Sequence, residues 1–465
     1  MNEQLNATIN YSTDTIAAIS SGSHINQPIS IVRLAGPDAV SIIKKIYKGK
    51  IGEDHQITYG HLYDDQTLVD EVLVMWFSGK KDKNGQLVYN NYVGEPLIEI
   101  NCHGGIVVTN KVLELLLAHG ARLAERGEFT RRAFLNGKMD LVKAEAVHDL
   151  IMSQTTQQAY ASVNKFNGKT SNLIDNFLQK IAILIGICEV NIDYPEYEDI
   201  EHMDNQNMLN HLAELTRDLT KIIKVSEDAR YVFEGVKVGF LGKPNVGKSS
   251  ILNALLSEDK AIVTDIAGTT RDLVEATYKI NDMLFKLVDT AGLRNTKEII
   301  EKIGIDKSLQ QIEKADLVVH VTDTVQTNNE FDQLIEQKAK ELNKFYIKVL
   351  NKIDLLDKSD ILTSNTVKIS ALHDNISELE NALVSNFANI DIFDERIFNN
   401  TRQLSLIKSA LNSLKQATDA LNYNATFDMI IVDLYAAWDA LQNIKGNVNR
   451  EDLLDVMFST FCLGK

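Results

Sequence analysis

A run near the middle of the chain, residues 242–249 with the sequence GKPNVGKS, has glycines, lysines and a hydroxyl at the spacing of a phosphate-binding loop. The apolar run 236–241 before it predicts a buried strand, and a helix is expected directly after it. Glycines let backbone N–H groups converge on phosphate oxygens, and the helix adds the positive end of its dipole. Lys248 would bring charge to the β and γ phosphates, and the hydroxyl of Ser249 is placed to ligate Mg²⁺.

Two further polar segments follow this loop. The sequence Asp-Thr-Ala-Gly at 289–292 comes after the apolar run 283–288. A carboxylate at a strand end can hold Mg²⁺ through water, and a glycine N–H there can sense a γ phosphate. Residues 268–272 (GTTRD) lie between the two motifs, and their Thr270 is the natural second protein ligand for Mg²⁺. Alone these residues would be read as a polar loop, and their position between the motifs is what favours the metal role.

The last two motifs predict the choice of base. Asn-Lys-Ile-Asp at 351–354 follows an apolar run. The Asp354 carboxylate can accept both the N1–H and the exocyclic amine of guanine, whereas adenine would leave it unpaired. Asn351 and Lys352 would brace neighbouring loops, and Ser-Ala-Leu at 370–372 would cover the base with backbone N–H groups. All four motifs stand at the ends of predicted strands, where parallel sheets bind ligands, and they indicate a Mg²⁺-dependent GTP hydrolase.

The residues alone leave open which group orients the attacking water. Ras-like enzymes carry a glutamine directly after the Asp-Thr-Ala-Gly motif, but Leu293 stands at that position and cannot orient water. No arginine finger is evident in the sequence. The candidates are Arg294, Glu298 and Glu301, and their spacing does not distinguish them from solvated loop charges.

Sequence textures indicate how the chain is divided. Residues 1–128 mix short β-rich runs with Gly and Asn turns, and 129–234 show helical periodicity. Strands and helices alternate over 235–389, as in a parallel α/β sheet, before helical periodicity returns over 390–465. The expected fold class is multidomain α/β, with the nucleotide-binding domain inserted into a discontinuous helical domain. Two separate helical domains are the alternative that texture leaves open.

Composition narrows the remaining possibilities. A length of 465 residues suits about three domains, and a net charge of −16 is not that of an obvious polyanion binder. Any RNA contact must then use a local patch, and solubility is the simpler reading of the acidity. Cys102, Cys188 and Cys462 show neither disulfide nor zinc spacing, and no apolar run has the length of a membrane span. We therefore expect a cytoplasmic protein.

Three segments outside the nucleotide motifs carry a family resemblance: CHGG at 102–105, GEFTRRAFLNGK at 127–138 and FCLGK at 461–465. With the nucleotide motifs they make essentially the whole chain similar to the tRNA modification GTPases MnmE (TrmE), which belong to the TrmE-Era-EngA-Septin-like P-loop GTPases. The resemblance implies an α+β folate-binding and dimerisation domain at 1–128. It also implies a helical domain at 129–234 plus 390–465 and an inserted G domain at 235–389.

The resemblance further implies partners and a reaction. A homodimer would join the FAD-dependent protein MnmG (GidA) in a heterotetramer or larger complex. The complex would add an aminomethyl or carboxymethylaminomethyl group to C5 of the wobble uridine (U34) of certain tRNAs. A tetrahydrofolate derivative, 5-formyl or 5,10-methylene, would bind as the one-carbon cofactor. Pairing of two G domains across their nucleotide faces would activate the hydrolysis of GTP to GDP.

Within the G domain, the family pattern gives roles to single residues. Asn245 matches a K⁺ ligand, and this K⁺ would replace an arginine finger. Backbone carbonyls of Thr264, Ile266 and Thr269 would complete the K⁺ site, and Glu301 matches the glutamate that positions water. The residues expected around the nucleotide are Asn245, Val246, Gly247, Lys248, Ser249, Ser250, Thr264, Asp265, Ile266, Ala267, Gly268, Thr269, Thr270, Asp289, Thr290, Ala291, Gly292, Asn351, Lys352, Asp354, Ser370 and Ala371.

A second site is implied for folate, at positions matched by Arg33, Glu99, Lys138 and Lys465. The cations suit the ligand's carboxylates and Glu99 suits donors of the pterin ring, but without the resemblance each would be read as half of a surface ion pair. Cys462 matches a cysteine needed for modification and is a candidate nucleophile, although cysteine is more often a small buried apolar group. Residues 20–28 replace the family's Gly-rich loop, so this pocket is expected to differ in detail.

Two other functions stay open at this point. One is a regulatory GTPase that binds ribosomes or RNA without covalent chemistry, which would not account for the folate-like N-terminus or for Cys462. The other is a folate-dependent one-carbon enzyme with a GTPase regulator, which folate turnover without a partner would favour.

Overall fold

The computed structural model describes residues 14–21, 26–193, 205–255, 277–288, 309–323, 330–355, 366–373, 376–446, 454 and 457–464. The chain divides into two compact units. The first unit consists of Met1–Ile151, Lys165–Ser171 and Leu441–Lys465, and the second of Met152–Asn164 and Asn172–Ala440. The first unit thus joins the end of the chain to its beginning, a grouping that the sequence textures do not indicate. The predicted division into three domains is a different one and stays a prediction.

The first unit is built on a seven-stranded sheet of order β3-β4-β5-β8-β2-β1-β9. Its strands are antiparallel to their neighbours except for β1 and β9, which are parallel. They span β1 (Ile16–Ile19), β2 (Ile29–Ala35), β3 (Tyr47–Gly49), β4 (Gln56–Asp64), β5 (Thr67–Phe77), β8 (Leu97–His103) and β9 (Arg122–Leu123). A separate hairpin joins β6 (Lys80–Lys81) to β7 (Leu87–Val88).

Two helices cover one face of this sheet. Because side chains alternate along a strand, Val72 and Val74 of β5 are buried while Leu73 between them is exposed. The buried set forms one core with residues of α1 (Ala39–Ile46) and α2 (Ile106–Ala118). The unit is therefore an α+β layer structure, with more helix than the β-rich runs of residues 1–128 indicate.

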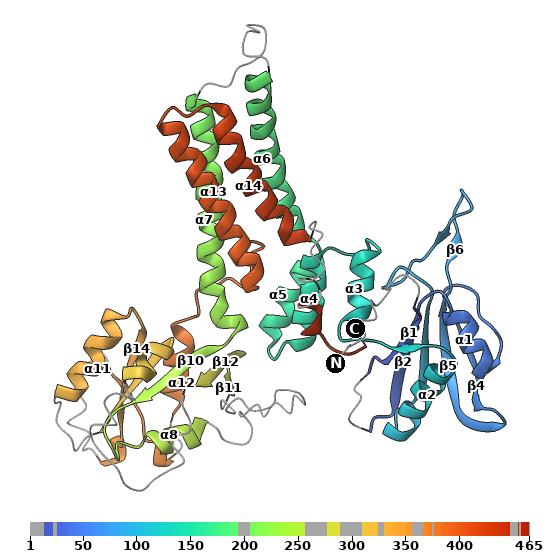
Figure 1. Ribbon diagram of the computed structural model, residues 1–465. Coiled ribbons are helices and arrows are strands. Elements are labelled where there is room, and N and C mark those ends of the chain that lie inside the picture. Colours follow the sequence, from blue (N-terminus) through green and yellow to red (C-terminus); the bar gives the residue numbers. More distant parts are fainter. Residues whose placement is uncertain are drawn as a thin grey trace, which may run out of the picture. The chain divides into compact units, whose positions relative to one another are not determined.

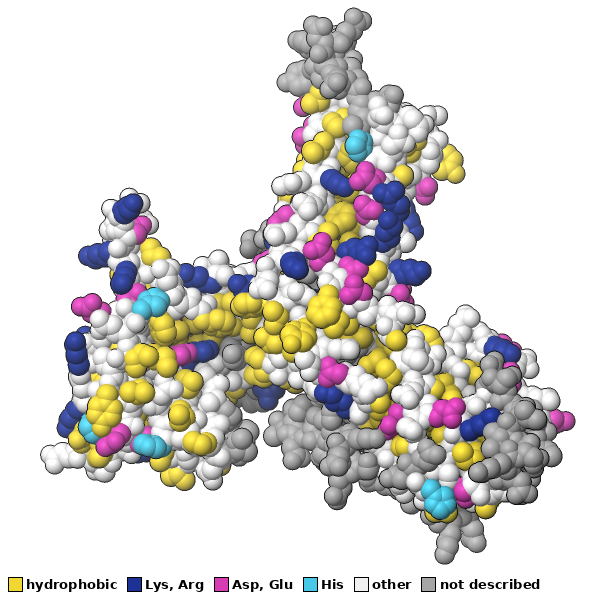
Figure 2. Space-filling model, turned by 180° about the vertical axis from the view of Figure 1, so that it is seen from behind, with side chains coloured by type: hydrophobic (Ala, Val, Ile, Leu, Met, Phe, Trp, Pro, Cys, Tyr) yellow, Lys and Arg dark blue, Asp and Glu magenta, His cyan; other side chains and the backbone are white. Residues whose placement is uncertain are grey.

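The other face of the sheet keeps apolar side chains in solvent. Ile57 and Tyr59 of β4 are 62% and 58% exposed, and Leu73 of β5 is 47% exposed. Figure 2 shows apolar side chains gathered on the surface of the first unit. Contiguous exposed apolar surface commonly marks an interaction face.

The last residues of the chain pack inside the first unit. Phe458 and Phe461 form a small core with Leu141 and Ala144 of α4 (Leu141–Met152). The preceding helix, α3 (Glu128–Leu135), begins after Gly127, whose N–H donates to the carbonyl of Cys462. This contact brings the sequence motif at 127–138 against the closing pentapeptide.

Long helices belong wholly or mainly to the second unit. They are α5 (Thr156–Phe166), α6 (Lys169–Asp193), α7 (Asn205–Phe233), α13 (Thr401–Asn422) and α14 (Phe427–Lys445). Helices α7 and α13 pack side by side (Figure 1) through apolar residues spaced by three and four, such as Leu212, Leu215 and Leu219 on α7. The α/β segment of the chain lies in sequence between these two packed helices.

The α/β segment forms a six-stranded sheet of order β11-β12-β10-β13-β14-β15, parallel except at β11. Its strands are β10 (Val236–Leu241), β11 (Thr277–Ile280), β12 (Met283–Leu287), β13 (Leu317–Asp323), β14 (Phe345–Asn351) and β15 (Val367–Lys368). The helices are α8 (Lys248–Leu255), α11 (Glu330–Glu341) and α12 (Ser377–Ser385), with 3-10 turns η1 (Ile353–Leu355) and η2 (Ala371–His373).

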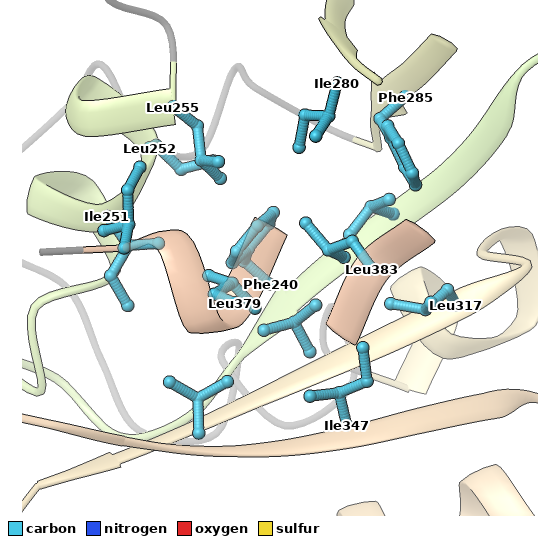
Figure 3. Close-up of a cluster of buried hydrophobic side chains, with 14 of the residues drawn as sticks. Phe240, Ile251, Leu252, Leu255, Ile280, Phe285, Leu317, Ile347, Leu379 and Leu383 are labelled. Atoms are coloured by element: carbon cyan, nitrogen blue, oxygen red, sulfur yellow. The ribbon is translucent and has the colours of Figure 1, made fainter. Parts of the chain in front are cut away.

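Helices cover both faces of this sheet. On one face, Ile251 and Leu252 of α8 and Leu379 of α12 point into a core with Phe240 of β10 (Figure 3). On the other face, α11 packs against β13 through Ile335. The carboxyl ends of β10, β13, β14 and β15 consequently meet at one edge. Among the helices of the described residues, none combines the length and apolar character required to cross a membrane.

Candidate functional site

The loop after β10 has the backbone form that a phosphate cradle requires. Gly242, Asn245 and Gly247 have φ angles of +145°, +65° and +97°. A Cβ on Gly242 would lie 2.1 Å from the carbonyl oxygen of Val321, so no side chain fits where the loop crosses β13. Helix α8 begins at Lys248, so its N-terminal N–H groups face the inside of this loop.

Lys248 supplies the positive charge of the loop. Its Nζ donates to the carbonyls of Gly242, at 2.8 Å, and Lys243, at 2.6 Å. Burial lowers the pKa of Lys248 to about 8. An anion bound beside it, such as a phosphate, would favour the charged form of the lysine. Ser249 and Ser250 follow in the first turn of α8 and are exposed, so the hydroxyl of Ser249 is accessible to a cation.

The loop after β14 holds the phosphate loop from the side. The amide Nδ2 of Asn351 donates to the carbonyl of Val246 at 3.0 Å, and its Oδ1 accepts from the N–H of Ala371 at 3.1 Å. Lys352 donates to the carbonyl of Asn245 at 2.7 Å and pairs with Asp323 at 2.8 Å. Two neighbouring side chains therefore join three loops at the carboxyl edge of the sheet.

The candidate base-recognition group is the exposed carboxylate of Asp354. It accepts a hydrogen bond from the Ser370 hydroxyl, which is the main reason that the pKa of Asp354 lies below its ordinary value. The carboxylate is therefore ionised at neutral pH. It lies beside Ala371, whose N–H is fixed by Asn351, so the two base motifs are brought together.

Part of the predicted site falls outside the described residues. This part comprises Thr264, Asp265, Ile266, Ala267, Gly268, Thr269 and Thr270, then Asp289, Thr290, Ala291 and Gly292, then Leu293, Arg294, Glu298 and Glu301, and finally Lys465. The predicted Mg²⁺ ligand Thr270, the K⁺ carbonyls and the water-positioning Glu301 thus remain predictions.

In the first unit, Arg33 and Glu99 lie opposite each other on β2 and β8. Arg33 Nη2 lies 2.8 Å from Glu99 Oε1, and the two side chains are only 11% and 16% exposed. The rings of Tyr92 and Phe129 lie 5.5 Å and 5.4 Å from the guanidinium. Arg33 and Glu99 therefore form an ion pair, as expected for these residue types without the family resemblance. The pair is largely buried, however, and does not lie on the surface.

The end of the chain lies beside this pair. The carbonyl of Gly464 accepts from Arg33 Nη1 at 3.2 Å and from the Ser20 hydroxyl at 2.9 Å. Two residues earlier, Cys462 is half-buried. Lys138 is directed elsewhere, since its Nζ donates to the carbonyl of Tyr89. The structure therefore gathers Arg33, Glu99 and the closing segment, whereas Lys138 makes its described contact at another loop.

Sequence reasoning missed several residues of both sites. Asp323, the partner of Lys352, ends the apolar run of β13, and its place at a strand end was a usable signal. Phe129 stands within the motif at 127–138 but was not singled out. Ser20 belongs to the segment 20–28 that the sequence links to this pocket, but its bond to Gly464 was not predicted. Nothing local marks Tyr92, because its contact depends on a distant segment.

A phosphate cradle at the head of α8 and an ionised carboxylate at the base loop, joined at one edge of a parallel sheet, define a P-loop GTPase. Sequence comparison identifies the family of this GTPase. The pattern described as "MnmE helical domain" matches residues 141–462, and that of "GTP-binding protein TrmE N-terminus" matches residues 15–138. The chain belongs to the family of tRNA modification GTPases MnmE, which confirms the resemblance inferred from the motifs.

Individual relatives agree over nearly the full length. The tRNA modification GTPase MnmE of Mycoplasmopsis pulmonis (strain UAB CTIP) is 51% identical over 454 residues, which covers 97% of this chain and 100% of that protein. The protein of the same name from Mycoplasmopsis synoviae (strain 53) is 52% identical over 97% of this chain and 99% of its own. That of Lactococcus lactis subsp. cremoris (strain MG1363) is 41% identical over 98% of this chain and 100% of its own.

Proposed function

We propose that this chain hydrolyses GTP and couples the hydrolysis to the modification of wobble uridine in tRNA. The observation that carries the GTPase part is the joint held by Asn351, which ties the phosphate loop at Val246 to the base loop at Ala371. This joint fixes the distance between the group that binds phosphate and the carboxylate that selects guanine. Family membership adds the tRNA reaction.

The residues of the phosphate loop fit two cations. Ser249 offers an exposed hydroxyl, and Asn245 offers an exposed amide oxygen on a backbone with φ of +65°. Hard cations prefer such oxygen ligands. Ser249 with Thr270 would hold Mg²⁺, and Asn245 with the carbonyls of Thr264, Ile266 and Thr269 would hold K⁺. When bound, these ions would neutralise charge that develops on the phosphates.

The chain's own groups then have distinct tasks. Lys248 would transfer its hydrogen bonds from two loop carbonyls to the β and γ phosphates, with no reorganisation of the loop. Asp354 would accept from the two guanine donors while Ser370 keeps it ionised. Glu301 would position the attacking water, and pairing of two G domains would order the segments that contain Glu301 and Thr270.

A folate derivative would bind beside Arg33, with Lys465 supplying a further cation and Cys462 a thiol. A guanidinium suits the carboxylates of such a ligand, and Glu99 suits ring N–H donors. Lys138 donates to the carbonyl of Tyr89 and has two further N–H donors with which it could take part. Since Arg33 already pairs with Glu99, the ligand would have to share or exchange these partners.

The remaining proposals concern organisation and partners. Residues 1–128 would bind folate and dimerise, residues 129–234 with 390–465 would form the helical domain, and 235–389 the G domain. The exposed apolar face at Ile57, Tyr59 and Leu73 supports a homodimer. The FAD-dependent protein MnmG would complete the modifying complex, and a cytoplasmic location stays a prediction.

Mass spectrometry of tRNA nucleosides tests the coupled function. A deletion strain is expected to lose the C5-substituted wobble uridine, and re-expression of the chain should restore it. Unchanged wobble uridine would leave a regulatory GTPase that binds RNA as the better reading. Folate turnover by the purified chain without a partner protein would instead favour a one-carbon enzyme with a GTPase regulator.

A further inference from the structure

The phosphate loop has an anchor that lies outside the nucleotide-contacting residues. Lys243, its second residue, reaches across the edge of the sheet to α11, where its Nζ lies 3.1 Å from Oδ2 of Asp332. The side chains are 14% and 3% exposed, so this is a desolvated ion pair rather than a surface one. Asp332 stands in the first turn of α11, where a negative charge also favours the helix dipole.

The anchor continues into the core. Oδ1 of Asp332 lies 3.0 Å from Nε2 of His320 on β13, and Nδ1 of the same ring lies 2.7 Å from the hydroxyl of Tyr346 on β14. His320 is 1% exposed. A carboxylate can only accept, so Nε2 carries the proton and Nδ1 accepts from the tyrosine. Every hydrogen bond in the chain of four side chains then has a donor and an acceptor.

The apolar surroundings of this buried ion pair indicate that it is not there for stability alone. Val318, Ile335 and Ala339 form the apolar layer between β13 and α11, on the face of the sheet where His320 lies. Apolar side chains of similar volume commonly stabilise such a layer better than a buried ion pair does. Because these four hydrogen-bonded polar side chains end on the phosphate loop, we infer that they hold that loop in place.

The backbone of Lys243 shows what would be held. Its carbonyl accepts from Nζ of Lys248 at 2.6 Å, next to the carbonyl of Gly242 at 2.8 Å. Gly242 itself lies against the carbonyl of Val321, the residue after His320 on β13. The first turn of the loop is thus fixed to β13 through its backbone and to α11 through the Lys243 side chain.

We propose that Lys243 and Asp332 are positioning residues for nucleotide binding at this GTPase site, and that the hydrogen-bonded series Lys243–Asp332–His320–Tyr346 fixes the turn that aligns Lys248 with the phosphates. This inference rests on the proposed GTPase function of the same site. Lys243 acts through its own peptide group on Lys248 and does not touch the reacting atoms.

The test uses the full chain and N-methylanthraniloyl GDP and GTP as fluorescent probes. Lys243→Met removes the anchor but leaves Asp332 without its cation, so stability is expected to fall together with nucleotide affinity. In the double variant Lys243→Met with Asp332→Asn, the stranded charge is gone. We expect stability to return while nucleotide affinity stays about tenfold weak, a change that corresponds to 1.4 kcal/mol. Lys243→Arg keeps the ion pair and should restore affinity.

A matched control breaks another ion pair at the opposite end of β13. Arg230 lies 3.1 Å from Asp316, and Arg230→Met is expected to leave nucleotide affinity within about twofold of wild type. Wild-type affinity in the stable double variant would overturn the positioning role alone. A wild-type chain that binds neither probe would overturn the proposed function and this inference together.

Discussion

In the G domain, the nucleotide loops follow the ends of parallel strands. Hydrogen bonds within and between these loops hold the side chains of Lys248, Asn351 and Asp354. In the first unit, by contrast, Arg33 stands in the middle of a strand and meets Glu99 on the next strand and the carbonyl of Gly464 from the far end of the chain. The first arrangement leaves charges ready for a ligand, whereas the second has already paired them.

Because of this difference, ligand binding has to break protein contacts at the first-unit site but not at the guanine-recognition carboxylate. Asp354 is ionised and exposed, so guanine can bind without displacing a protein cation. Arg33 is largely buried among Glu99, Tyr92 and Phe129, so a ligand there must compete with existing partners. We therefore expect substitutions in the G domain to have larger effects on binding than substitutions at the first-unit site.

The largest effect is expected from Asp354→Asn. Two hydrogen bonds to a charged acceptor are worth roughly 1.5–3 kcal/mol each, so GTP affinity should fall about 100-fold or more. Xanthosine triphosphate, which offers an acceptor where guanine has its amine, should gain affinity relative to GTP. Competition against a fluorescent nucleotide measures both changes, with Asp228→Asn on α7 as the exposed control. GTP affinity equal to wild type would mean that the base site is misassigned.

A smaller but still large effect is expected from the monovalent cation. GTP turnover should be about tenfold or more faster in K⁺ than in Na⁺ at matched ionic strength, since K⁺ at Asn245 would stabilise charge on the phosphates. Phosphate release assays in the two salts measure the ratio. Asn245→Ala should bring the ratio close to one. Equal rates in the wild-type chain would contradict the K⁺ site.

At the first-unit site we expect Arg33→Met to weaken binding of 5-formyltetrahydrofolate by roughly tenfold, as befits the loss of one charge-assisted contact. Isothermal titration calorimetry of the full chain measures it. Lys111→Met is a suitable control, because it breaks the exposed pair with Asp64 in the same unit. If both variants bound folate like the wild type, Arg33 and Glu99 would be only a structural ion pair.

The smallest effect concerns pH. Burial lowers the pKa of His320, so the folded G domain favours the neutral ring more than the unfolded chain does. Above the ordinary histidine pKa, His320 is neutral in both states and has no such effect on the free energy of unfolding. As pH falls below that value, protonation of the unfolded chain lowers the free energy of unfolding, by at most about 1.4 kcal/mol for each unit of pKa shift. We expect the protection factors of β13 amides, which are corrected for the intrinsic pH dependence of exchange, to fall between pH 7 and 5.5, and His320→Gln to reduce that fall. The same pH slope in both chains would exclude His320 as its source.

The contrast between the sites also explains what could be predicted from the sequence. The parallel sheet, the phosphate loop and the base loop follow from local runs, because each functional residue lies within a few positions of the strand that places it. The meeting of Gly464 with Ser20 and Arg33 does not, because it joins segments more than 400 residues apart. The hydrogen-bonded series from Lys243 to Tyr346 escaped prediction for a related reason, because the partners of His320 on α11 and β14 are distant in sequence.

Ser226 on α7 bonds the chain twice just after it leaves the α/β segment, to the carbonyl of Arg396 at 3.2 Å and the N–H of Phe398 at 3.0 Å. The chain therefore enters and leaves the α/β segment at neighbouring positions. We therefore expect that residues 235–389 can be replaced by a short linker between α7 and α13, and that these two helices then remain packed against each other.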